Sequence, residues 1–312
     1  MKKVVFLMDI NSRNDSGYSA SIIWWYGILE KFGYEVFYED YAEYNAEEFY
    51  EKMKHYKPYF IFHPTYTKVH TEFIKLKEFT KVFIIQSDDM WRYDNFSKYW
   101  IPYIHGTVTF EGVKENYIRD GLDEKNFHKI KWCFNPNTQD LDKTYKKDIE
   151  ISHIGNVHSH QYRVEQINKF RNLGKDVQIF HGVNYEEAKR AWAQSKYTLS
   201  FTMNSSNTVR EPKGRVVEVP NFAVLFTEDF PGLKEYYNND EMVVFSSVED
   251  CIEKINYFDK NPKELEKIYL KGKKALWGRN TVYHEWNKIL PQIDEDYKKI
   301  NPNEIIKKYH NK

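Results

Sequence analysis

Short apolar runs alternate with amphipathic stretches along most of this chain. In the first half, period-two and continuous apolar runs predict strands at residues 4–8, 34–38, 58–64, 82–86, 106–110 and 130–134. Apolar residues at helical spacing predict helices at residues 17–31, 46–55 and 111–120. Strands that alternate with helices across short connections indicate a doubly wound parallel sheet.

The alternation resumes after a polar segment at residues 135–147, which we interpret as a linker. We expect strands at residues 149–154, 177–180, 197–201, 222–227 and 242–245. Helices are expected at residues 161–173, 186–194, 248–258, 262–272, 281–289 and 304–308. The chain should therefore form two α/β lobes, residues 1–140 and 141–312, with a cleft between them that would suit a ligand. The last helices could pack back on the first lobe.

The connection between the strands at residues 197–201 and 222–227 is rich in charge. A polar loop leads to a helix signal with proline in its first turn, which predicts a strand–loop–helix–strand crossover. A helix start suits an anion, and Gly214, Arg215 and Glu218 would share one helix face. In one interpretation, Lys213 and Arg215 hold a diphosphate and Glu218 accepts hydrogen bonds from a ribose. In the other, Arg215 and Glu218 form an ion pair on a solvated face.

Composition and charge narrow the class of protein. Of the 312 residues, 41% are hydrophobic and 29% are charged, which is typical of a globular chain and not of a disordered one. Lys plus Arg and Asp plus Glu both number 46, so the zero net charge argues mildly against a DNA-binding protein but allows a local basic patch. No apolar run approaches the ~20 residues of a membrane span. Cys133 and Cys251 are isolated, so we expect a cytoplasmic protein with reduced thiols.

Several other residues are candidates for binding or chemistry. Asp88 and Asp89 follow a predicted strand, where either could be a general base or a helix cap. Adjacent side chains on an extended strand point in opposite directions, so at most one of the two acids should face the cleft. Four further residues are candidates for the acceptor side of the cleft. His63 lies at the end of one predicted strand. Gly17, Tyr18 and Ser19 open the first predicted helix, where a plain helix cap is the alternative.

The sequence argues against a metal site and against a dinucleotide cofactor. His153, His158 and His160 are close in sequence, but their spacing supplies no second set of ligands, so we expect no metal. The glycine fingerprint of dinucleotide-binding enzymes is absent, which argues against a nicotinamide cofactor. Arg163, in the first turn after the Gly155 loop, is either a cation for a ligand or a solvated helix residue.

A resemblance to a known family is carried by five segments in order along residues 81–290. The sequence resembles bacterial glycosyltransferases related to spore-maturation proteins, whose second lobe belongs to the group-1 clan. The segments are Ser87-Asp88-Asp89-Met90-Trp91-Arg92-Tyr93-Asp94, Ile151-Ser152-His153-Ile154-Gly155, Lys213-Gly214-Arg215-Val216-Val217-Glu218-Val219-Pro220, Phe230-Pro231-Gly232-Leu233-Lys234-Glu235-Tyr236-Tyr237 and Asn280-Thr281-Val282-Tyr283. The resemblance implies a GT-B fold with two Rossmann-like lobes, the donor mainly on the second and the acceptor mainly on the first. That fold requires no metal and no cofactor.

The resemblance also implies roles for individual residues. Glu218 falls on the acid that binds the donor ribose, and Lys213 and Arg215 fall on the basic positions beside the diphosphate. Gly155 would let its loop approach the donor closely. The sequence departs from the group-1 pattern where Arg210 stands eight positions before Glu218, in place of a glutamate. The nearest acid is Glu211, which with Arg210 and Gly214 completes the expected donor site.

The implied activity is a nucleotide-sugar-dependent glycosyl transfer, hexosyl or related, with a retaining course somewhat favoured over an inverting one. Cations would stabilise the departing diphosphate, and the candidates are Arg163, Arg210, Lys213 and Arg215. The acceptor could be a saccharide, a protein, a small molecule or a modified DNA base, as in phage-type DNA glycosyltransferases. A non-catalytic nucleotide-sugar-binding or coat protein with the same fold is the alternative, and a sugar phosphorylase is a weaker one.

Overall fold

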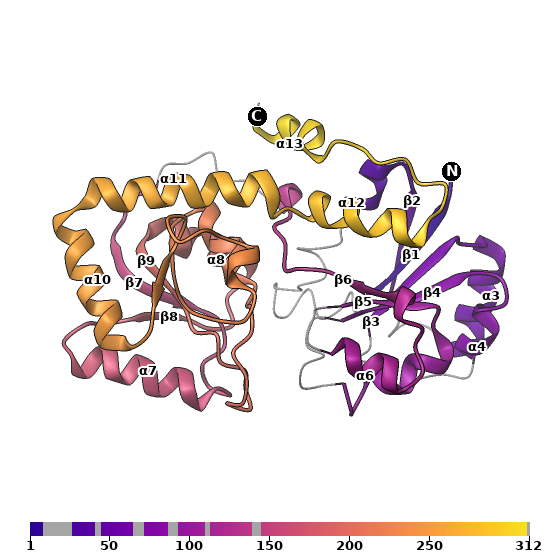
Figure 1. Ribbon diagram of the computed structural model, residues 1–312, viewed down its shortest axis with the longest axis horizontal. Helices are drawn as coiled ribbons and strands as arrows, with labels where there is room; N and C mark the ends of the chain where they lie inside the picture. The colour runs from indigo at the N-terminus through magenta and orange to yellow at the C-terminus, as the bar shows by residue number, and fades with distance from the viewer. Residues whose placement is uncertain are drawn as a thin grey trace. The chain divides into compact units, whose positions relative to one another are not determined.

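A computed structural model describes residues 1–8, 27–40, 45–64, 72–86, 93–109, 113–138 and 145–310 (Figure 1). The described chain divides into two compact units. The first unit runs up to Lys131 and resumes at Val282, and the second unit spans Trp132–Thr281. Each unit is an α/β sandwich around its own parallel sheet, as the alternation of strands and helices predicts.

The sheet of the first unit has six parallel strands in the order β2-β1-β3-β4-β5-β6. They are β1 (Lys3–Met8), β2 (Glu35–Asp40), β3 (Phe60–Pro64), β4 (Lys81–Gln86), β5 (Gly106–Thr109) and β6 (Phe127–Lys129). The prediction of a strand at residues 130–134 is wrong, because the last strand of this sheet ends at Lys129. Phe134 instead forms a single bridge with Thr281 and packs on Trp277 at 5.3 Å between ring centroids, inside the second unit.

Helices cover both faces of the first sheet. On one face, α3 (Ala46–Tyr56), α4 (Glu72–Leu76) and α6 (Lys114–Arg119) bury an aliphatic and aromatic core. On the other face, Trp286 of α12 (Val282–Ile293) meets the rings of Phe6 and Phe62 at 6.4 and 5.2 Å. This packing explains why the chain after Thr281 belongs to the first unit. The sequence analysis assigned this segment to the second lobe but allowed its last helices to pack back on the first lobe. The final helix is α13 (Pro302–His310).

The sheet of the second unit has five parallel strands in the order β11-β10-β9-β7-β8. They are β7 (Ile149–Ile154), β8 (Gln178–Phe180), β9 (Ser195–Ser200), β10 (Val224–Glu228) and β11 (Val243–Phe245). Four helices surround it, α7 (Gln161–Asn172), α8 (Tyr185–Gln194), α10 (Val248–Lys260) and α11 (Pro262–Arg279), and Figure 1 shows α7 and α11 on opposite sides of the strands. The pairing of β9 with β10 confirms the predicted crossover.

That crossover contains the single helical turn α9 (Arg215–Glu218). Short 3-10 segments complete the secondary structure: Leu29–Phe32, Ser97–Tyr103, Glu124–Asn126, Pro136–Thr138, Val219–Asn221 and Leu233–Glu235. Cys133 and Cys251 are buried and form no disulfide with each other, as expected for packing residues. In the part of the chain that the structure describes, none of the helices has the length and hydrophobicity to span a bilayer.

Candidate functional site

Three cations gather at the carboxyl ends of β7 and β9 in the second unit, and we call Arg163, Lys213 and Arg215 the cationic cluster. Arg215 Nη1 donates to the carbonyl oxygen of Ile154 at 2.8 Å. Arg163 Nη1 donates to the carbonyl oxygen of Asn156 at 2.6 Å. Two guanidinium groups from different elements therefore hold the same loop after β7, which fixes their own positions as well as that of the loop.

Gly155 lies between those two carbonyls, and any other residue there would be strained. Its φ of 137° lies in the region that L side chains rarely adopt. A Cβ atom at this position would stand 2.4 Å from Arg215 Nη1. The glycine therefore does permit a close approach, and the group that approaches is Arg215. A close approach by a donor stays a prediction.

Burial shifts the pKa values of residues in and beside the cationic cluster. Arg163 is 4% exposed, so its interpretation as a solvated helix residue is wrong. Burial lowers the pKa of Arg163, and the charge of Arg215 lowers it further. Burial also lowers the pKa of Lys213, while Glu211 opposes that shift. The pKa of His160 falls to about 4, through burial and then through the three cations. A desolvated group of like charges is a favourable place for an anion.

Two glutamates accompany the cationic cluster. Glu211 forms an ion pair with Lys213, and the Glu211 N–H donates to the carbonyl oxygen of Thr202 at 3.0 Å. Glu218 is 1% exposed, which contradicts the interpretation of this residue as part of a solvated face. Its carboxylate oxygens lie 3.3 and 3.4 Å from the place where a Cβ of Gly214 would stand. The predicted sharing of one helix face by Gly214 and Glu218 is therefore observed.

The helix that carries Arg215 and Glu218 is short, in line with the short helix signal of the sequence. It has four residues and continues as a 3-10 turn over Val219–Asn221. A helix dipole needs several aligned peptide units, so the expected attraction of an anion to this helix start contributes little. The positive potential here comes from the Arg and Lys side chains.

Arg210 belongs to a separate network of hydrogen bonds. Its Nη1 lies 3.1 Å from Glu228 Oε2, and its Nη2 donates to the Tyr162 hydroxyl at 3.3 Å. Glu228 is 3% exposed and also accepts from the Tyr162 hydroxyl and, at 2.8 Å, from the Thr202 N–H. Beside Arg210 opens a pocket of about 460 Å³, which is also lined by Asp229, Phe230, Pro231, Phe245 and Ser246.

Three residues of this network were not identified as candidates from the sequence: Glu228, Tyr162 and Thr202. The signal for Glu228 was present, because it ends β10 and the carboxyl ends of adjacent parallel strands meet at one edge of a sheet. The role of Tyr162 had no such signal, since only the folded chain brings its hydroxyl to Glu228. Glu228 neutralises Arg210 and ties the loop after β9 to the end of β10.

The three neighbouring histidines have different surroundings. His153 is fully buried, and its Nδ1 donates to the carbonyl oxygen of Leu199 at 3.1 Å, so Nε2 is an acceptor. Within the described residues that Nε2 has no hydrogen-bond partner, and it lies 3.9 Å from the Cβ position of Gly155. His158 packs against the ring of His181 at 4.7 Å. Across the described ranges, no group of three or more His, Cys, Asp or Glu side chains is arranged for a metal.

The candidates of the first unit are mostly outside the described residues. Gly17, Tyr18, Ser19, Asp88 and Asp89 all fall there, so their roles stay predictions. His63 of β3 is 1% exposed, and its ring packs against that of Trp100 with 4.4 Å between the ring centroids. Its ring therefore belongs to the core of the first unit.

Comparisons with known proteins agree with this architecture. Residues 141–291 match the family model described as "Glycosyl transferase-like". A search of curated proteins found no match. The fold is shared with an α-glucosyltransferase solved with UDP-glucose and DNA containing an abasic site, at a TM-score of 0.65 and 10% identity over 94% of this chain and 99% of that one.

Two further structures share the fold at 10% identity over 95% of this chain. HepE from Anabaena, solved with UDP, has a TM-score of 0.56 and is covered over its full length. Sucrose-phosphate synthase from Thermosynechococcus elongatus has a TM-score of 0.57 and is covered over 98% of its length. The narrower resemblance to spore-maturation-type enzymes stays a prediction. This chain has the GT-B fold of the glycosyltransferases, and its residues 141–291 are glycosyl transferase-like in sequence.

Proposed function

We propose that this protein transfers a sugar, a hexose or a close relative, from a nucleotide-sugar donor to a hydroxyl acceptor. The observation that carries the proposal is the cationic cluster at the carboxyl ends of β7 and β9, in which Arg163 is buried and Lys213 and Arg215 are partly buried, with the Glu218 carboxylate beside it. Open α/β sheets bind ligands at this edge. The UDP and UDP-glucose bound to neighbours of the same fold support a nucleotide-sugar donor.

In this proposal the donor diphosphate occupies the cationic cluster. Arg163 and Arg215 are held by backbone carbonyls, so little reorganisation is needed when the anion arrives. Lys213 would share its charge between Glu211 and a phosphate oxygen. Glu218 would accept hydrogen bonds from the ribose hydroxyls. The buried His153 Nε2 would accept a hydrogen bond from one further hydroxyl of the nucleotide-sugar.

The chemical step breaks the bond between the anomeric carbon and the diphosphate oxygen. Negative charge develops on the departing diphosphate, where fixed cations stabilise it. We propose a retaining course without a metal, in which the acceptor oxygen bonds to the anomeric carbon and its proton passes to the departing phosphate. An inverting course would instead need a protein base near the acceptor hydroxyl. Analysis of the anomeric configuration of the product by NMR distinguishes the two courses.

Donor binding is tested by the thermal stability of the protein with a panel of nucleoside diphosphates and their sugars. A ligand that binds only the folded state at 100 times its Kd adds about 2.7 kcal/mol of stability, so Tm should rise measurably. Replacing Glu218 by Ala removes the ribose acceptor and should weaken nucleotide binding by roughly 10-fold. Glu264→Ala, an exposed carboxylate on α11, is the matched control and should respond as the wild type does. Failure of every nucleotide to raise Tm would refute the donor site.

Catalysis is tested separately from binding. Incubation with each donor that raises Tm should release free sugar slowly, or transfer it when saccharides, peptides, small hydroxyl compounds or modified DNA are added. DNA belongs in this panel because a neighbour of the same fold was solved with DNA. Tight binding without hydrolysis or transfer would favour the alternative of a non-catalytic nucleotide-sugar-binding protein.

A further inference from the structure

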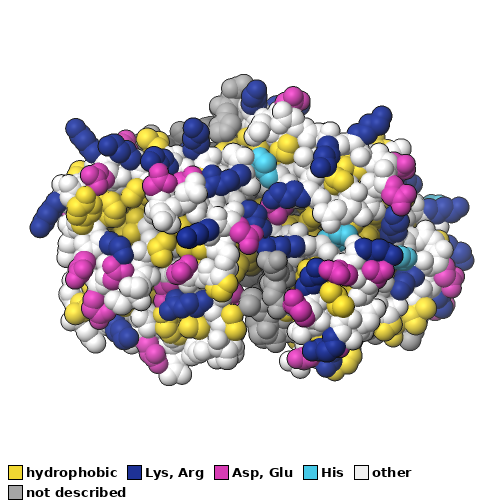
Figure 2. All heavy atoms as spheres, in the orientation of Figure 1, with side chains coloured by type: hydrophobic (Ala, Val, Ile, Leu, Met, Phe, Trp, Pro, Cys, Tyr) yellow, Lys and Arg dark blue, Asp and Glu magenta, His cyan; other side chains and the backbone are white. Residues whose placement is uncertain are grey.

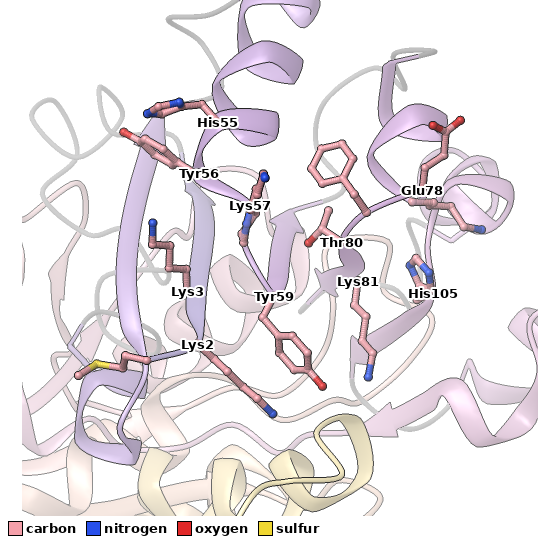
Figure 3. Close-up of a pocket in the computed structure, with 14 residues that line it drawn as sticks. Lys2, Lys3, His55, Tyr56, Lys57, Tyr59, Glu78, Thr80, Lys81 and His105 are labelled. Carbon is pink, nitrogen blue, oxygen red and sulfur yellow. The ribbon is translucent and has the colours of Figure 1, made fainter.

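The first unit contains a lysine-rich pocket of about 720 Å³ that the proposed function does not use. We call it the lysine pocket and show it in Figure 3. Its lining comes from the start of β1, the end of α3, the turn after α4 and the starts of β3, β4 and β5. The charged members of this lining are Lys2, Lys3, Lys57, Lys77, Lys81, His55, His105 and Glu78.

Parallel strand order explains how these residues come together. All strands of a parallel sheet begin at one edge, and a lysine stands at or next to the start of β1 and β4, which flank β3. Open α/β sheets bind their substrates at the opposite edge, where the strands end. The lysine pocket is therefore a site apart from the substrate-binding edge of its own sheet.

The lining carries five ammonium groups against one carboxylate. Lys2 is paired with Asp294 and Asp296, which lie just after α12. The other four lysines have no carboxylate partner among the described residues: Lys3, Lys57, Lys77 and Lys81. The whole chain has zero net charge, and Figure 2 shows both signs intermixed over the visible face. The pocket therefore concentrates positive charge on a neutral protein.

Two of these lysines are held in place by neutral acceptors. Lys77 Nζ donates to the carbonyl oxygen of Pro102 at 3.0 Å, and Lys81 Nζ donates to that of Ile293 at 3.1 Å. An ammonium has three N–H donors, so each keeps two for a ligand. Burial, followed by the charges of Lys77 and Lys81, lowers the pKa of His105. Its Nδ1 accepts the Val82 N–H at 3.1 Å, which leaves Nε2–H as a further donor.

Lys57 occupies a backbone position that favours glycine. It caps the carboxyl end of α3 with φ 48° and ψ 57°, in the left-handed region. Glycine is the usual residue there because a side chain strains this conformation. A lysine at this position retains a charge on the rim of the lysine pocket at a cost in backbone energy, which is typical of residues kept for binding. In Figure 3, Lys2 and Lys81 lie on either side of the Tyr59 ring, and Lys3 and Lys57 stand farther from that ring.

We propose that the lysine pocket binds a compact ligand that carries several phosphate groups. Its volume lies in the range of small-molecule sites, which extends from about 300 to 1,000 Å³. Its cations are lysines, which act as mobile point charges and suit clustered phosphates better than planar carboxylates. Tyr59, with Lys2 at 4.1 Å and Lys81 at 5.1 Å from its ring centroid, holds those two ammonium groups beside the opening.

Tripolyphosphate is the probe, and isothermal titration calorimetry of the full chain measures its binding. The titrations use an Arg215→Ala background, which weakens the candidate diphosphate site of the second unit and leaves the first unit unchanged. We expect saturable binding that weakens as salt is raised. The double variant Lys3→Gln with Lys57→Gln should lose affinity by about 10-fold or more. Lys307→Gln with Lys308→Gln, on exposed positions of α13, removes the same charge and should leave affinity unchanged.

Three results would overturn the proposal. They are the absence of saturable tripolyphosphate binding, equal weakening by the two double variants, and preferential binding of a short single-stranded oligonucleotide that is lost in Lys3→Gln with Lys57→Gln. The last result would assign the pocket to an extended phosphodiester backbone. Circular dichroism of both double variants confirms that each remains folded, so a lost signal reports on the pocket itself.

Discussion

The cationic cluster of the second unit and the lysine pocket of the first unit both concentrate positive charge, but their side chains have different surroundings. In the cationic cluster, Arg163 is almost fully buried and two guanidinium groups donate to backbone carbonyls of one loop. In the lysine pocket, Lys57 is exposed and the Lys3 ammonium lies 6.0 Å from the centroid of the Phe37 ring. The guanidinium groups of the first arrangement are held by the backbone, whereas the second combines lysines held by carbonyls, Lys77 and Lys81, with the exposed Lys57.

This difference predicts different uses for the two sites. Fixed cations in a desolvated place stabilise charge that develops during a reaction, because they need no reorganisation when it appears. Hydrated lysines attract an anion over a wider range of positions and lose part of that attraction in salt. We therefore expect chemistry at the cationic cluster and binding alone at the lysine pocket.

The largest effect is expected from Arg215→Ala. Loss of one fixed donor to the departing diphosphate should lower the rate of transfer by about 100- to 1,000-fold. Lys57→Ala should leave that rate unchanged, because the lysine pocket takes no part in the reaction. Steady-state kinetics with the donor identified by thermal shift compares the two variants. Equal losses of rate would break the distinction between the sites.

Glu228→Gln should have the next largest effect, on stability. The buried carboxylate neutralises Arg210 and accepts from Tyr162 and Thr202, and an amide in its place supplies one acceptor and removes the charge. We expect the free energy of unfolding to fall by about 1–3 kcal/mol. Urea denaturation measures it, with Glu264→Gln, an exposed acceptor of a tyrosine hydroxyl, as the control. A change below about 0.5 kcal/mol, as at ordinary surface sites, would contradict the positioning role.

His153 should make stability depend on pH. Burial, Arg215 and Arg163 lower its pKa well below the usual 6.5 in the folded state. As the pH falls, the unfolded chain therefore binds a proton at this histidine before the folded protein does. The contribution of His153 to the free energy of unfolding is fully present above pH 6.5 and is lost as the pH falls below that value. Lowering the pH from 6.5 to 5.5 should remove about 1 kcal/mol through this residue. Urea denaturation at both pH values should show a smaller loss for His153→Gln, and an equal loss would exclude His153 as the cause.

Lys57→Gly should have the smallest effect and the opposite sign. Glycine relieves the left-handed backbone at the end of α3, so the free energy of unfolding should rise by about 0.5–1 kcal/mol. The same variant should bind tripolyphosphate less tightly than the wild type, as titration calorimetry would show. Higher stability with unchanged affinity would mean that this lysine has no role in the pocket.

Much of the fold followed from local patterns. The apolar runs at 4–8 and 149–154 became β1 and β7, and the crossover from β9 to β10 carries the charged segment as expected. Local patterns failed at residues 130–134, where an apolar run leaves the first sheet to pack in the second unit. The short helix signal at Arg215 became a single turn, which is followed by a 3-10 turn that contains Pro220.

The sequence by itself determined which residues could hold an anion, since Lys213, Arg215 and Glu218 stand together in one short segment. Tertiary structure alone decided that Arg163 is buried beside them, that Glu228 neutralises Arg210 and that lysines from several segments share one pocket. The physical reason is that burial and charge pairing depend on strand order in each sheet, which places residues far apart in the chain at one edge.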